Sequence, residues 1–103
     1  MARPYSQKFL LELYGNTSDG LGVQLAKLCV KANLPATYVA VACETTRTSI
    51  YSWFRGQGIR EKKHNLVKSF IALVESDMAN GVLPAKSTEE AKKYIEAMLG
   101  VTL

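Results

Sequence analysis

The sequence predicts an all-α protein in which five to six helices pack into one compact domain covering residues 1–103. Three observations favour this fold. Apolar residues recur at helical spacing along most of the chain, helix-capping residues stand between those segments, and no segment alternates convincingly like a strand. The 103 residues, 48% of them hydrophobic and 21% charged, suffice for one buried core but not for two.

Two helices are expected at the start of the chain. The first covers residues 7–14, with Ser6 as its N-cap, and it ends at Gly15-Asn16. A turn at residues 16–20 leads to the second helix, at residues 21–32. The apolar face of the first helix consists of Phe9, Leu10, Leu13 and Tyr14, and that of the second consists of Leu21, Leu25, Leu28, Cys29 and Ala32.

A short helix is expected next, over residues 35–43. Pro35 suits the start of this helix because the N–H group that proline lacks has no helical partner there. The β-branched Val39 and Val41 leave a strand as the alternative for the same segment.

A second short helix is expected over residues 47–55. Thr46 is a good N-cap for it, and Gly56 suits the left-handed position that follows a helix end. Residues 57–63 are polar and basic, so they are expected to form a loop.

Two C-terminal helices complete the predicted fold, at residues 63–79 and 88–99. Ser87 and Glu90 form a capping box at the start of the last helix. The apolar stripe of the long helix consists of Leu66, Val67, Phe70, Ile71, Leu73, Val74 and Met78, and that of the last helix of Ala91, Tyr94, Ile95 and Met98. The long stripe is wider than a surface helix needs. It is either a dimer surface, together with the last helix, or a surface for packing within the chain.

Composition argues against several function classes. Cys29 and Cys43 lie within helical apolar patterns, so both are expected to be reduced core residues. With no CxxC motif and a single histidine, His64, expected to be exposed, we expect neither a metal site nor a cofactor. No glycine-rich phosphate loop, catalytic carboxylate pair or cysteine–histidine pair indicates an enzyme. The absence of a long apolar run or a signal-peptide core favours an intracellular, cytoplasmic protein without a membrane partner.

Positive charge is concentrated in one part of the chain. The net charge is +4 and the pI about 9.2. Residues 44–63 carry a net +3 from five basic and two acidic side chains, whereas residues 64–103 carry a net −1. A local excess of positive charge favours a polyanionic partner.

Four residues in the middle of the chain carry a family resemblance. A small residue, Ala40, is followed ten positions later by Ile50, then by Trp53 and by Gly56. This pattern resembles the helix-turn-helix of the phage Cro and repressor-type DNA-binding family. The resemblance implies a lambda repressor-like core over residues 21–56. The chain departs from the family at Glu44, where glycine is usual, and at Thr45, where an aliphatic residue is usual. These departures predict a turn of different shape or greater length.

The resemblance also implies which side chains meet DNA. The helix that starts at Arg47 would enter the major groove, with Arg47 and Thr48 nearest to the base edges and basic residues along the phosphates. The predicted DNA-binding residues are Thr37, Thr46, Arg47, Thr48, Tyr51, Ser52, Arg55, Arg60, Lys62 and Lys63.

The expected function is therefore sequence-specific binding of double-stranded DNA by a phage or bacterial transcription regulator. A homodimer is expected because one short helix reads few base pairs. Two alternatives stay open. One is a protein-interaction module on the same scaffold, in which residues 63–99 bind RNA polymerase or a host-defence protein. The other is a small terminase-like DNA-packaging subunit that forms a ring.

Overall fold

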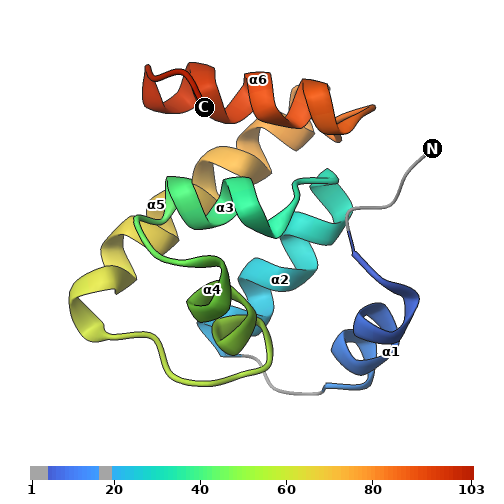
Figure 1. The fold of residues 1–103 in the computed structure, drawn as a ribbon, viewed down its shortest axis with the longest axis vertical. Coiled ribbons are helices and arrows are strands. Elements are labelled where there is room, and N and C mark those ends of the chain that lie inside the picture. The colour runs from blue at the N-terminus through green and yellow to red at the C-terminus, as the bar shows by residue number, and fades with distance from the viewer. Residues whose placement is uncertain (1–4, 17–19) are drawn as a thin grey trace.

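The computed structural model describes residues 5–16 and 20–103, and all regular secondary structure in these ranges is helical (Figure 1). The helices are α1 (Gln7–Gly15), α2 (Leu21–Ala32), α3 (Ala36–Ala42), α4 (Arg47–Phe54), α5 (Glu61–Ala79) and α6 (Thr88–Leu99). The all-α prediction is confirmed. Residues 17–19 of the predicted turn lie outside the described residues. Within the described ranges, no helix combines the length and apolar character needed to cross a membrane.

The three predicted side-chain N-caps are confirmed. The hydroxyl oxygens of Ser6, Thr46 and Ser87 each accept a hydrogen bond from the backbone N–H three residues later, at 3.1 Å. Each cap satisfies a donor that the first turn of a helix leaves unpaired, which stabilises a helix by about 1 kcal/mol. The capping residues therefore fix where α1, α4 and α6 begin.

The start of α5 differs from the prediction. This helix begins at Glu61 instead of residue 63, so the loop after α4 is shorter than expected. A glutamate in the first turn interacts favourably with the positive end of the helix dipole, which explains the earlier start.

The prediction that His64 is exposed was wrong. This residue is half-buried, and its Nε2 atom lies 2.7 Å from the carbonyl oxygen of Ile59.

α2 forms the centre of the core. It packs against α1, α4 and α5, while α3 packs against α4 and α6 (Figure 1). Leu25, Ala26 and Cys29 of α2 are fully buried. α2 and α4 lie in close contact at Gly22, where an added Cβ would overlap the carbonyl oxygen of Trp53 and lie 2.7 Å from its carbonyl carbon. The absence of a side chain at this position allows α4 to lie directly against α2.

The apolar stripe of α5 packs mainly inside the chain. Val67, Phe70 and Val74 are buried, while Leu73 is 44% exposed. α5 packs on α2, so most of this stripe is used for packing within the chain. On α1, Phe9 and Leu13 face the core as predicted, but Tyr14 is 57% exposed. A helix of two and a half turns presents only a narrow face to a single neighbour, and Phe9 and Leu13 occupy it.

Among the described residues, four ionisable side chains have raised pKa values, which favours their neutral forms. Burial raises the pKa of the Cys43 thiol from 9.0 to about 12, although the Lys63 ammonium acts in the opposite direction. Burial also raises the pKa of Cys29 and of Tyr5. Burial and a hydrogen bond donated to Asp77 raise the pKa of Tyr94. Both cysteines are free thiols, as the sequence predicts.

The raised pKa values predict that stability declines in alkali. Above about pH 9 the unfolded chain loses thiol protons that the folded chain retains, so the stability present below the unfolded pKa is lost as pH rises. Between about pH 8 and pH 10.5, Cys43 alone should contribute a loss of about 2 kcal/mol. Urea unfolding at the two pH values measures this loss. Cys43→Ala should show a shallower decline, and equal declines in both proteins would contradict the assignment to Cys43.

Candidate nucleic-acid interface

The inner face of α4 is firmly anchored. Ile50, Trp53 and Phe54 are 0%, 8% and 1% exposed. The Phe54 ring lies against three other aromatic rings, with centroid distances of 6.2 Å to Tyr5, 6.0 Å to Phe9 and 5.9 Å to Tyr51. This aromatic cluster joins α4 to α1 and to the segment that precedes it.

The outer face of α4 is polar and accessible. Arg47, Thr48 and Arg55 are exposed, while Tyr51 and Ser52 are half-buried. Because residues four apart lie nearly above one another on a helix, these side chains form two lines. Thr48 and Ser52 lie opposite the buried face, whereas Arg47, Tyr51 and Arg55 lie on the side that faces α1. The predicted binding residues on α4 are thus brought together on one continuous surface.

The C-terminal part of the chain lies away from this surface. α6 packs against α3, and α4 lies on the other side of α3 (Figure 1). Two hydrogen bonds hold the α5–α6 connection against the end of α2. The Ala85 N–H donates to the Ala32 carbonyl oxygen at 3.0 Å, and Asn33 Nδ2 donates to the Ala85 carbonyl oxygen at 2.7 Å. α6 is therefore fixed where it leaves the N-terminal end of α4 uncovered.

The turn between α3 and α4 is tight despite its unusual residues. Glu44 has a φ of 54°, in the left-handed region that glycine favours. The Thr45 N–H donates to the Ala40 carbonyl oxygen at 2.9 Å, and the Glu44 N–H donates to that of Val41 at 3.1 Å. This pair of bonds is the Schellman arrangement that commonly ends helices. Glu44 therefore adopts the left-handed backbone conformation that a glycine would adopt, and the connection between α3 and α4 is only four residues long.

Glu44→Gly should stabilise the protein by ~0.5 kcal/mol. The left-handed conformation costs residues with a Cβ roughly 1–2 kcal/mol, and the greater freedom of glycine in the unfolded chain offsets part of the gain. The urea unfolding midpoint measures the effect. Glu44→Ala is the matched control, because it removes the charge but keeps the Cβ and the strain. Equal stabilisation by both variants would show that charge, and not backbone conformation, is responsible.

Lys63 supports the turn. Its Nζ atom donates a hydrogen bond to the backbone carbonyl oxygen of Glu44 at 2.8 Å, and its side chain is half-buried. The contact connects the first turns of α5 to the α3–α4 turn. Lys63 was predicted to meet DNA, and the structure gives this ammonium group a role within the fold.

The remaining predicted DNA-binding residues differ in whether their side chains are already used within the fold. The Thr46 hydroxyl accepts from the Ser49 N–H and donates to the Ser49 hydroxyl at 3.0 Å, so it is occupied by capping. Arg60 and Lys62 are exposed at the start of α5, and Thr37 is exposed on α3. These three side chains remain accessible to a partner.

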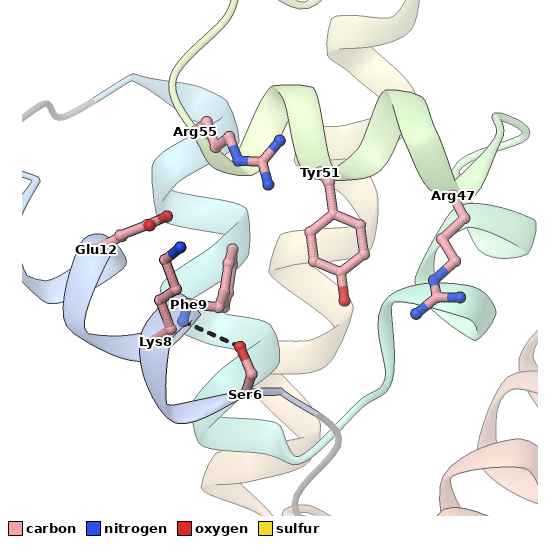
Figure 2. Close-up of a pocket in the computed structure, with 7 residues that line it drawn as sticks. All are labelled: Ser6, Lys8, Phe9, Glu12, Arg47, Tyr51 and Arg55. Atoms are coloured by element: carbon pink, nitrogen blue, oxygen red, sulfur yellow. Dashed lines mark hydrogen bonds between the residues drawn. The ribbon is translucent and has the colours of Figure 1, made fainter.

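Sequence reasoning missed a groove between α1 and α4. It has a volume of about 430 Å³ and is lined by Ser6, Lys8, Phe9, Glu12, Arg47, Tyr51 and Arg55 (Figure 2). The Arg47 guanidinium lies 5.7 Å from the centre of the Tyr51 ring, which meets the Phe9 ring edge-on at 5.5 Å. The sequence shows Lys8 and Glu12 one turn apart on the same helix, but it gives no sign that α4 lies beside them.

No known protein family, characterised protein or solved structure was found to match this chain. Among the described residues, no group of three or more His, Cys, Asp or Glu side chains is placed to hold a metal ion.

Proposed function

We propose that this protein binds double-stranded DNA sequence-specifically, as a transcription regulator, with α3, the turn and α4 acting as a helix-turn-helix. One observation carries the proposal: α4 has its apolar side fully buried and its polar N-terminal side exposed. Ile50 and Trp53 fix its position, while Arg47 and Thr48 remain on the surface. A recognition helix needs this combination, because its N-terminal side chains must reach base edges from a rigid support.

Charge supports the same assignment. Arg55 at the C-terminal end of α4 and Arg60 and Lys62 near the start of α5 are all exposed. If each of these three cations neutralises one phosphate, the logarithm of the binding constant should fall with the logarithm of salt concentration with a slope of about −3 per protomer. Arginine is also suited to pair bidentately with guanine, which gives discrimination between bases.

A homodimer is part of this proposal. With only eight residues, α4 contacts few base pairs, and a dimer would read two half-sites about one helical turn apart. Leu73 on α5 and Leu99 on α6 are 44% and 36% exposed, so some apolar surface remains available on the two C-terminal helices.

Selection of bound sequences from a random duplex pool, at low and at moderate salt, tests the proposal. We expect a palindromic consensus that survives at the higher salt concentration, because base contacts depend less on salt than phosphate contacts do. Binding without a consensus would support the packaging alternative, in which case a mass above that of a dimer is expected. No duplex binding at low salt would overturn the DNA-binding proposal and favour the protein-interaction alternative.

A further inference from the structure

The groove between α1 and α4 has walls from distant parts of the chain. Ser6, Lys8, Phe9 and Glu12 belong to the α1 side, and Arg47 and Tyr51 of α4 and its C-cap Arg55 form the other side (Figure 2). A smaller hollow of about 190 Å³ shares Phe9, Glu12 and Arg55 with the groove. The depression therefore continues along α1 beyond the first set of lining residues.

The chemistry of the groove fits an extended anion better than a small apolar ligand. Its walls carry three cationic side chains and one carboxylate, and the aromatic rings of Phe9 and Tyr51 lie between them. Small-molecule sites are mostly apolar and enclose their ligands. A shallow channel lined by cations instead attracts a chain of phosphates.

The position of α1 limits how DNA can approach. The major groove is about 12 Å wide, and an α-helix with its side chains is about 10–12 Å in diameter, so α4 alone would fill it. α1 lies beside α4, held by the contacts of Phe9 with Tyr51 and Phe54. When α4 occupies the major groove, α1 lies outside it, and the groove between the two helices offers a path for a strand that borders the major groove.

We propose that the groove between α1 and α4 holds one sugar–phosphate strand of the bound duplex, with Lys8 of α1 and Arg55 of α4 contacting its phosphates from opposite walls. This inference rests on the proposed function. It adds α1 to the DNA interface and makes Lys8 a phosphate-binding residue. Glu12 lies in the same groove and repels the phosphates of the strand, so it weakens binding.

Lys8→Ala and Glu12→Gln test the inference, with binding to a labelled duplex measured by fluorescence anisotropy between about 50 mM and about 200 mM salt. The labelled duplex contains the consensus sequence if the selection from the random pool yields one. Otherwise a duplex of random sequence is used. Lys8→Ala should weaken binding several-fold and make the salt slope less negative by about 0.9, which corresponds to one lost phosphate contact. Glu12→Gln should tighten binding. The matched controls are Lys93→Ala and Glu89→Gln, which remove the same charges from exposed positions on α6.

The outcomes separate the two proposals. If the wild-type protein binds DNA and both groove variants behave like their α6 controls, the groove inference is overturned while DNA binding stands. If Lys8→Ala weakens binding but leaves the salt slope unchanged, Lys8 acts on the position of α1 and not on a phosphate, which also overturns the inference. If the wild-type protein binds no duplex at all, both proposals fail. Thermal unfolding monitored by circular dichroism checks that each variant is folded.

Discussion

Gly22→Ala should destabilise the protein by about 3 kcal/mol, because the new methyl group would overlap the backbone of α4. A Cβ at this position would meet the carbonyl oxygen of Trp53 and lie 2.7 Å from its carbonyl carbon. Backbone atoms inside a helix cannot rotate away as the end of a flexible side chain can. The two helices must therefore separate, and the packing of Trp53 and Ile50 against the core loosens with them.

Denaturant unfolding measures this loss. Gly58→Ala is the matched control, since no atom lies within 4 Å of the Cβ it would add. We expect the control to unfold within about 0.5 kcal/mol of the wild-type protein, as surface substitutions usually do. If Gly22→Ala were as stable as the control, α2 and α4 would have to lie further apart than the structure places them.

Local sequence signals were enough to locate most helices. Ser6, Thr46 and Ser87 predict helix starts because a hydroxyl at that position pairs with a backbone N–H only three residues away. The buried faces follow from helical periodicity for the same reason, since Ile50 and Trp53 are separated by less than one turn. Interactions within one turn are readable from the chain because covalent geometry fixes the distance between the residues.

Contacts between distant segments could not be predicted in this way. Gly22 meets Trp53 across a separation of 31 residues, and nothing near Gly22 in the sequence indicates the close approach. The hydrogen bond from Lys63 to the Glu44 carbonyl oxygen and the position of α1 beside α4 also depend on how distant helices pack together. The backbone conformation of Glu44 could not be predicted for a different reason. Two backbone hydrogen bonds and the Lys63 contact hold a glutamate in a conformation that its intrinsic preferences disfavour.

The double variant Arg47→Ala, Thr48→Ala should lose more than tenfold in affinity for the selected duplex while remaining folded. Both side chains are exposed at the start of α4, so their removal leaves the buried face intact. An arginine paired with guanine contributes about 1–3 kcal/mol of discrimination against other bases. The loss should therefore be concentrated on the selected sequence, and binding to a scrambled duplex should change much less. Anisotropy titrations with both duplexes measure the two affinities.

A second double variant, Arg60→Ala, Lys62→Ala, is the control that distinguishes the loss of base contacts from the loss of phosphate contacts. These exposed cations lie before and within the first turn of α5, outside α4, whose N-terminal side chains are proposed to meet the bases. As phosphate contacts they should weaken binding to both duplexes equally and make the salt slope less negative by about 2, while leaving discrimination unchanged. If the Arg47 and Thr48 variant instead behaved like this one, α4 would meet only the phosphate backbone. Base recognition would then have to come from another part of the protein, because phosphates carry no direct sequence information.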